Sequence, residues 1–384
     1  MLLWSVPGMN NTARIDSPDV EVDRGVFIHL NVHWPVIEKP QAAVLVIPGT
    51  GGIGDLAFDR EIEATSYDSF HRGGLTQALI DAGYVAIFMN QRGYERLEEC
   101  VTGTSLAARI DSFVTSCIDR RTRADVHLQT TTDDLSKVIA YLKEQRIIGS
   151  IPLVAIGVSE GLFHLARQRH GREAIDGAIG FGGPTVPLPE VLQYQLSRRY
   201  FIDLAAKALD RCDAPALDVG QLPACSGEAL TDRGKLLLRD TLGTSVTRES
   251  LRERRFEWDR FSEQLLGVSR LGSTKPLSGE FLGRNIESLW AGDYFRSMVT
   301  DDLAPPAALR KKSIPTVFVF GDGDYHVPPV RPNDCNAGTA PPSSPPCTFV
   351  LIAGNDHSGL LEPASSRRSI RALLDSITQL LRHP

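Results

Sequence analysis

The sequence predicts an α/β protein with a mostly parallel, doubly wound sheet into which a long helical segment is inserted. Short apolar runs rich in β-branched residues alternate with segments of helical periodicity along most of the chain. The runs are apolar throughout, which is typical of strands in a parallel sheet covered by helices on both faces. Two stretches, at about 94–124 and 184–312, interrupt the alternation, and the second is too long for a loop.

Each expected strand is a short run of mainly apolar residues, and the first is expected at an edge of the sheet. The runs lie at 26–33, 42–47, 84–89, 153–156, 175–181, 316–320 and 348–352. The expected helices carry apolar residues three and four positions apart, as at Leu135, Val138, Ile139 and Leu142. These helices lie at 74–82, 132–145, 161–169 and, after Pro363, along the C-terminal segment.

The longer interruption is rich in Leu, Arg and Glu and is mostly helical in its period. We therefore expect a helical cap inserted into the sheet domain. The chain then divides into a first core part at 1–183, the cap at 184–312 and a second core part at 313–384. Most aromatic side chains of the cap are expected to pack in its own core.

The composition excludes several classes of protein. Hydrophobic residues make up 42% and charged residues 23% of the 384 positions, which is ordinary for a soluble globular chain. Asp and Glu outnumber Lys and Arg by 47 to 41, so no basic face for nucleic acid is indicated. No apolar run approaches the roughly 18 residues that a membrane span needs. The Cys and His spacings match no structural zinc site, and we expect no metal.

The six cysteines form three sequential couples: Cys100 with Cys117, Cys212 with Cys225, and Cys335 with Cys347. All six lie in expected loops or insertions, so we expect three local disulfides. Such bonds persist only in an oxidising compartment, which favours a periplasmic or extracellular protein. The first eleven residues lack the basic and apolar regions of a signal peptide. Either an export signal is missing from this sequence, or the thiols are unpaired in a cytosolic enzyme.

The sharpest motif is Gly157-Val158-Ser159-Glu160-Gly161. It follows an expected strand and precedes a helical run, which is the context that the G-x-S-x-G nucleophile elbow requires. The turn is tight, and the glycines at both ends suit it. Such a turn lifts the serine hydroxyl above the carboxyl edge of the sheet, where ligands bind in open α/β folds. The alternative interpretation is a plain glycine-rich turn.

At this motif the chain resembles the α/β-hydrolase family, and the resemblance extends over roughly 25–183 and 313–384. The chain order in that family is nucleophile, acid and then His. The resemblance implies Asp324 as the acid, because the loop after the next-to-last strand resembles G-x-x-D-x-x-V-P, with Asp322 as the runner-up. It implies His357, after the last strand, as the base. His326 lies beside the acid on the wrong loop, and His164 is expected to pack in a helix.

The loop after the first buried strand, Pro48-Gly49-Thr50-Gly51-Gly52, resembles the family's H-G-x-G-G motif with Pro48 in place of His. The resemblance implies that the backbone N–H groups of Thr50 and Glu160 stabilise the oxyanion. A phosphate-binding loop would need a G-K-[ST] ending, which is absent. The run Asn90-Gln91-Arg92-Gly93 is similar to the family's D-x-R-G turn, whose role is structural.

The resemblance implies a serine hydrolase that cleaves carboxylic esters through an acyl-enzyme on Ser159 and needs no cofactor, because ester hydrolysis is the commonest activity of cap-bearing family members with this triad. The main alternative is an exopeptidase of the same fold, in which Glu160 or a cap carboxylate holds the substrate amine. A lactonase, a thioesterase and a non-catalytic binding protein are further alternatives. The size of the substrate and the oligomeric state stay open.

Overall fold

The structure is a computed structural model. It describes residues 12–49, 74–96, 100, 116–144, 147–228, 230, 232–272, 276–281, 284–330, 335, 346–353 and 363–382.

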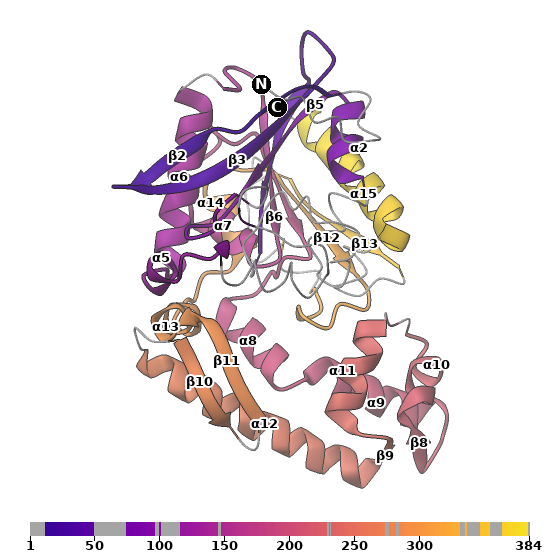
Figure 1. Ribbon diagram of the computed structural model, residues 1–384. Helices are drawn as coiled ribbons and strands as arrows, with labels where there is room; N and C mark the ends of the chain where they lie inside the picture. The colour runs from indigo at the N-terminus through magenta and orange to yellow at the C-terminus, as the bar shows by residue number, and fades with distance from the viewer. Residues whose placement is uncertain are drawn as a thin grey trace.

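Nine strands in these ranges form one central, mostly parallel sheet (Figure 1). The strand order is β1-β3-β5-β4-β6-β7-β12-β13, and β2 also pairs with β3. β3 is antiparallel to β1, β2 and β5, whereas the neighbouring pairs from β5 to β13 are parallel. The expectation that the strand at 26–33 lies at an edge is wrong, because β1 and β2 pair with it on the side away from β5. The strands are β1 (Thr12–Asp16), β2 (Asp19–Asp23), β3 (Val26–Pro35), β4 (Ala42–Ile47), β5 (Tyr84–Met89), β6 (Leu153–Val158), β7 (Gly177–Phe181), β12 (Thr316–Gly321) and β13 (Cys347–Ile352).

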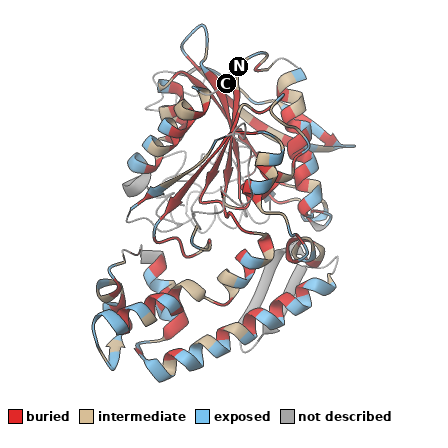
Figure 2. Cartoon of the chain, turned by 180° about the vertical axis from the view of Figure 1, so that it is seen from behind, coloured by how far each residue is buried: buried red, intermediate tan, exposed pale blue. Residues whose placement is uncertain are grey.

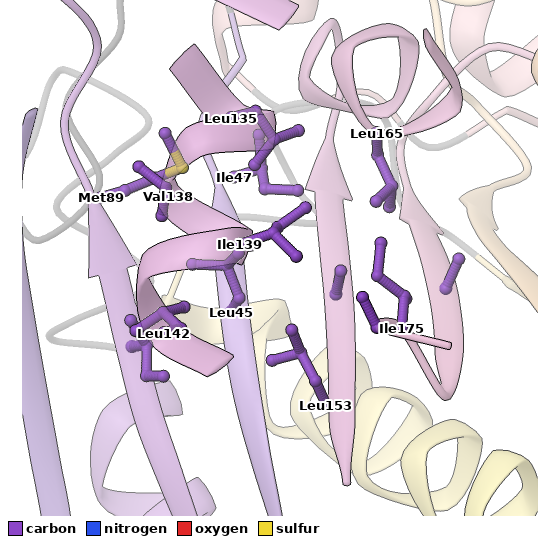
Figure 3. Packing of buried hydrophobic residues seen from close by; sticks show 14 of the residues in the cluster. Leu45, Ile47, Met89, Leu135, Val138, Ile139, Leu142, Leu153, Leu165 and Ile175 are labelled. Carbon is purple, nitrogen blue, oxygen red and sulfur yellow. The ribbon is translucent and has the colours of Figure 1, made fainter. Parts of the chain in front are cut away.

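Helices cover both faces of this sheet, which confirms the predicted doubly wound architecture. The apolar stripe of α6, with Leu135 and Ile139, packs on Leu45 and Leu153 of the sheet (Figure 3). On the opposite face, Leu79 and Ile377 pack on the other side of the same strands. The first face carries α6 (Leu128–Glu144), α7 (Gly161–Arg167) and α14 (Pro305–Lys311), and the second carries α2 (Leu75–Asp81) and α15 (Pro363–Leu381). A short helix, α5 (Arg120–Ala124), precedes α6.

The chain between β7 and α14 forms a separate layer beyond the carboxyl edge of the sheet, which we call the cap (Figures 1 and 2). It is mostly helical, as expected, and also contains two antiparallel ribbons, β8 with β9 and β10 with β11. Its elements are α8 (Leu188–Leu196), α9 (Arg199–Arg211), β8 (Ala216–Asp218), η2 (Val219–Gln221), α10 (Leu222–Ser226), α11 (Asp232–Leu242), β9 (Ser245–Thr247), α12 (Arg248–Leu271), β10 (Pro276–Phe281), β11 (Arg284–Ala291) and α13 (Gly292–Val299).

The cap has a hydrophobic core of its own. Phe201, Trp258 and Phe261 are buried in one cluster with the leucines of α9 and α12, so these aromatic side chains have the packing role expected for them. A second cluster joins Tyr294 of α13 to Phe163 of α7 and thereby fixes the cap to the sheet domain. The division at residues 184 and 312 remains our proposal.

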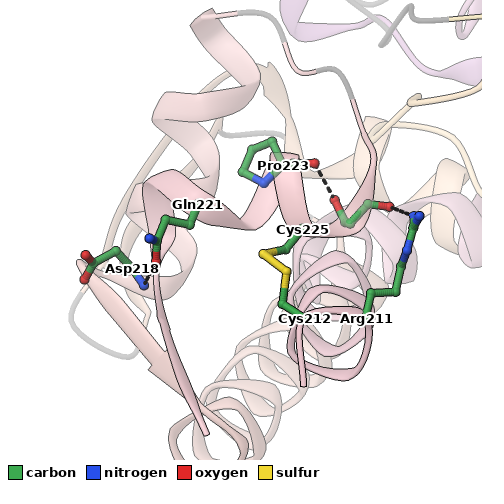
Figure 4. The surroundings of a disulfide bond; sticks show 7 residues. Arg211, Cys212, Asp218, Gln221, Pro223 and Cys225 are labelled. Carbon is green, nitrogen blue, oxygen red and sulfur yellow. Dashed lines mark hydrogen bonds between the residues drawn. A yellow bond between two sulfur atoms is a disulfide. The ribbon is translucent and has the colours of Figure 1, made fainter. Parts of the chain in front are cut away.

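The structure pairs the cysteines in the three predicted couples. The Cα atoms are 5.2 Å apart in Cys100–Cys117, 5.7 Å in Cys212–Cys225 and 5.6 Å in Cys335–Cys347. The second bond joins the end of α9 to α10, where Arg211 Nη1 also donates to the carbonyl of Ser226 over 2.5 Å (Figure 4). Within the described ranges, none of the helices is both long and apolar enough to cross a membrane.

Candidate active site

Ser159 lies in a tight turn between β6 and α7, at the carboxyl edge of the sheet. Its φ angle is 49°, in the left-handed region that non-glycine residues rarely adopt. The backbone N–H of Ser159 donates to the carbonyl of Phe181 over 3.0 Å, and its carbonyl accepts from Leu162 N over 3.2 Å. The residue is half-buried. A strained backbone held by its neighbours is the local geometry of a nucleophile elbow.

The glycines that flank this turn have no room for a side chain. A Cβ atom on Gly161 would lie 2.4 Å from the carbonyl oxygen of Ile47, and one on Gly157 would lie 2.5 Å from the Cα of Leu162. The backbone of α7 can therefore approach both β4 and β6 closely. The small residues of the motif are thus a steric requirement of the turn, as the sequence analysis expected.

The end of β4 lies directly beside the serine. A Cβ atom on Gly49 would lie 3.0 Å from Cβ of Ser159 and 3.4 Å from the backbone N of Glu160. Thr50, the predicted oxyanion donor in this loop, lies outside the described residues. The other predicted donor, Glu160, follows Ser159 in the turn.

Gln91 is hydrogen-bonded to the same loop, a contact that was not predicted from the sequence. Its buried side-chain Nε2 donates to the carbonyl of Gly49 over 3.3 Å. The neighbouring Arg92 makes a bidentate ion pair with the buried Asp134, at 2.9 and 2.7 Å, and this pairing raises the pKa of Arg92. The turn that resembles D-x-R-G is therefore structural, as expected, and its second residue also contacts the loop beside the serine.

The loop after β12 distinguishes the two candidate acids. The side chain of Asp324 is buried, and its Oδ1 accepts from the backbone N–H groups of His326 at 2.9 Å and Val327 at 3.1 Å. Asp322 is exposed, and its backbone N–H donates to the carbonyl of Ile352 over 3.3 Å. A fixed, buried carboxylate suits an acid that orients an imidazole, so the geometry favours Asp324.

The predicted base, His357, lies outside the described residues. The chain leading to it is described, because Ile352 at the end of β13 pairs in parallel register with Gly321 at the end of β12. The rival His326 is half-buried, with its ring centre 4.5 Å from that of Tyr325. His164 is fully buried in α7, in agreement with the packing role expected for it.

A buried polar cluster adjoins the serine, and the sequence pattern did not reveal it. The carboxylate of Glu160 accepts a hydrogen bond from the Tyr294 hydroxyl of α13 and lies 3.6 Å from Nε2 of His164. The buried Arg123 guanidinium lies 4.7 Å from the ring centre of Tyr94, and both residues interact electrostatically with Glu160. The available signal in the sequence was the charged Glu160 inside a turn expected to be buried. A buried carboxylate requires hydrogen-bonding or charged partners, so such a cluster could have been expected.

Burial controls the protonation of this cluster. It raises the pKa of Tyr94, whereas it lowers the pKa of Arg123 to about 10. The negative charge of Glu160 opposes the lowering of the Arg123 pKa, because it favours the guanidinium cation. At neutral pH the cluster therefore contains a cationic Arg123 and a neutral Tyr94.

A cleft of about 450 Å³ opens where the cap meets the loop that carries Asp324. Its lining includes Pro189, Gln193, Tyr194, Arg199, Asp259 and Pro328. Burial and the charge of Asp324 both raise the pKa of Tyr194.

Three features together define an α/β-hydrolase fold. They are the strand order of the sheet, the antiparallel pairing of β3 with β5, and the serine turn after β6. No protein-family model matches the sequence, and no curated protein does.

Solved structures of similar overall shape include a proline iminopeptidase from Mycobacterium smegmatis, with 13% identity, a TM-score of 0.47 and coverage of 95% of this chain and 99% of that one. They also include a lipase in an open form, with 16% identity, a TM-score of 0.48 and coverage of 96% and 99%. A thermophilic esterase from Thermogutta terrifontis has 14% identity, a TM-score of 0.44 and coverage of 96% and 99%.

Proposed function

We propose that this chain is a serine hydrolase of small carboxylic esters, with Ser159 as nucleophile, His357 as general base and Asp324 as the acid that orients the imidazole. The observation that carries the proposal is the strained backbone of Ser159, held at the carboxyl end of a central strand with Gly49 against it. Such a turn exposes a hydroxyl beside backbone amides, which is what acyl transfer requires.

In the proposed reaction, His357 takes the proton of the Ser159 hydroxyl as its oxygen attacks the ester carbonyl carbon. The backbone N–H groups of Thr50 and Glu160 hold the oxyanion. His357 then gives the proton to the leaving alcohol, and the acyl group stays on Ser159. A water molecule, deprotonated by His357, attacks the acyl carbon, and the carboxylic acid leaves as Ser159 regains a proton.

The surroundings of Glu160 favour an ester over a peptide substrate. An exopeptidase of this fold would need an acidic group free to hold the substrate amine. The carboxylate of Glu160 is only 4% exposed and already bonds to Tyr294, with the charge of Arg123 nearby. Binding an ammonium group there would break these interactions, so an exopeptidase would need a carboxylate from the cap.

We propose further that the cap forms the roof of the acyl or alcohol pocket. The cleft beside α8 supports this role, because residues of the cap line it together with Pro328 of the sheet domain. The three disulfides support an exported protein.

A fluorophosphonate probe tests the nucleophile directly. We expect one adduct, located on Ser159 by peptide mass spectrometry, and no adduct in a Ser159→Ala variant. If the wild-type protein is not labelled, the proposal that it is a serine hydrolase is refuted. A panel of aryl esters graded by acyl length, run beside aminoacyl arylamides, then separates esterase from exopeptidase. Ester turnover should fall as pH drops through about 6–7, because the imidazole must be neutral to act as a base.

A further inference from the structure

The residues that follow Ser159 and Asp324 in the chain both contact the cap. Glu160 follows Ser159, and its buried carboxylate accepts the hydroxyl hydrogen bond of Tyr294 on α13. Tyr294 is itself 1% exposed and belongs to the cluster that joins α13 to α7 and α8. The partners are 134 positions apart in the sequence.

The same arrangement recurs on the acid loop. Tyr325 follows Asp324, is 4% exposed and packs on the cap, with its ring centre 5.4 Å from that of Phe201 and 6.2 Å from that of Tyr200. Among the described residues, it is the one buried member of that cluster that does not come from the cap. Gln195 of α8 adds a polar contact, because its Nε2 donates to the backbone carbonyl of His326 over 2.7 Å.

We propose that Glu160 and Tyr325 are positioning residues through which the docked cap holds the Ser159 turn and the Asp324 loop in their working geometry. This inference rests on the proposed function, because it assigns a catalytic consequence to contacts beside Ser159 and Asp324. It makes the cap part of the catalytic arrangement as well as a cover for the substrate.

The contact at Glu160 acts through the backbone. The side chain of Glu160 is tethered to α13, and its backbone N–H is the proposed oxyanion donor. Freeing the carboxylate lets the peptide of a strained turn relax, which moves the donor away from the developing oxyanion. Displacements of about 1 Å at a reacting centre cost up to 100-fold in rate, so a small relaxation is measurable.

Several groups besides Tyr294 face the carboxylate of Glu160, and they would remain in a variant that lacks the Tyr294 hydroxyl. Arg123 and Tyr94 lie on the side of the sheet domain, and His164 lies on the same helix. Removing the Tyr294 hydroxyl leaves these groups in place, so the charge of Glu160 stays compensated. Tyr294→Phe therefore removes one tether and keeps the ring that fills the core.

The experiment compares two variants with matched controls in the full-length chain. Tyr294→Phe is paired with Tyr84→Phe, whose hydroxyl lies 3.5 Å from Thr378 Oγ1 between β5 and α15. Gln195→Leu is paired with Gln41→Leu, whose Nε2 donates to the carbonyl of Ala82 over 3.2 Å. For each protein we would measure the rate of labelling by a fluorophosphonate, the kcat and KM for an aryl acetate, and the thermal midpoint.

We expect Tyr294→Phe and Gln195→Leu to lower both the labelling rate and kcat by about 10-fold, with KM within about 2-fold of the wild-type value. The two controls should react at the wild-type rate, although their thermal midpoints should change about as much as those of the cap variants. Wild-type labelling rates in both cap variants would overturn the inference and leave the serine hydrolase standing. An unlabelled wild-type protein would instead refute the proposed function, and the inference with it. If one cap variant fails to fold, the other decides alone.

Discussion

The buried side chain of Gln91 donates a hydrogen bond to the backbone carbonyl of Gly49, and Gly49 lies against Ser159. In a trans peptide the carbonyl and the following N–H point in opposite directions. If the N–H of Thr50 binds the oxyanion, as proposed, the bond from Gln91 to the preceding carbonyl should orient that donor.

Replacing Gln91 with Leu should lower kcat for an aryl ester by about 10-fold and change KM little, because an oriented donor acts mainly on the transition state. Steady-state kinetics on the purified variant check this expectation. Gln41→Leu, which removes a similar bond to a backbone carbonyl, is the control. A variant that loses stability but keeps its kcat would contradict the role.

Gly161→Ala should disrupt the serine turn. The added Cβ would lie 2.4 Å from a carbonyl oxygen of β4, so the backbone must shift, at a cost of about 1–3 kcal/mol in the free energy of unfolding. Urea unfolding measures the loss, and fluorophosphonate labelling should fall with it. Gly267→Ala is the matched control. That glycine lies on the exposed side of α12 with no atom within 4 Å of the added Cβ, so we expect a gain of up to about 1 kcal/mol.

The disulfides should differ in their effect on activity. Removing either Cys100–Cys117 or Cys212–Cys225 by double Ser substitution should cost about 3 kcal/mol, since the two bonds close loops of similar length. Only the first loss should slow the labelling of Ser159. Ile118, which follows Cys117, pairs with Tyr94, and this segment leads into Arg123, so the first bond supports the cluster around Glu160.

Alkylation of the denatured, unreduced protein followed by intact mass measurement tests the pairing itself. We expect no added label, and six labelled thiols would contradict all three bonds. Equal labelling rates for the two double variants would contradict the special role of Cys100–Cys117.

Alkaline pH should stabilise the fold through Lys312. Burial lowers the pKa of this lysine to about 8, from its ordinary value of 10.5. Between these two values the unfolded chain holds a proton that the native protein has released, so the free energy of unfolding rises with pH. Below pH 8 both states are protonated and the gain disappears. Urea unfolding from pH 7 to 9.5 should show a smaller rise in Lys312→Met than in the wild type or in Lys311→Met, whose lysine is exposed. Parallel curves for all three would contradict this assignment.

The parallel part of the fold could be predicted because burial on both faces leaves a plain pattern. The strands Ala42–Ile47 and Tyr84–Met89 have the predicted ends, and every residue in them is buried. The start of α6 was predicted at residue 132, four positions late. Its first turn is held by the Ser297 hydroxyl of α13, which accepts from Leu128 N, and no local pattern contains that contact.

The ribbon of β10 and β11 was not predicted, because its sequence is mixed in polarity and lacks a strong β-branched run. β2 does carry a signal, since Val20 and Val22 alternate with exposed acidic residues. This strand and β1 could therefore have been predicted from their period of two.

At the site, the strand–turn–helix context of Ser159 was predictable from adjacent residues alone. Asp324 is buried and Asp322 is exposed, and the choice of Asp324 as the acid stays a prediction. The partners of Glu160 were beyond prediction, because the contact with Tyr294 depends on how a distant helix docks.

β7 and β12, which bracket the cap, are hydrogen-bonded neighbours in the sheet, with Ala178 opposite Thr316. Because the two strands are parallel, the chain leaves the sheet at the carboxyl end of β7 and re-enters it at the amino end of β12, and α14 on the first face of the sheet makes the return. The entropy of closing such an excursion grows only with the logarithm of its length, so this insertion is free to lengthen, shorten or be exchanged while the strand register persists. In evolution, substrate range can then diversify at the cap while the chemistry stays constant beneath it. If Glu160 and Tyr325 act as proposed, a replacement cap would have to restore the contacts at these two residues.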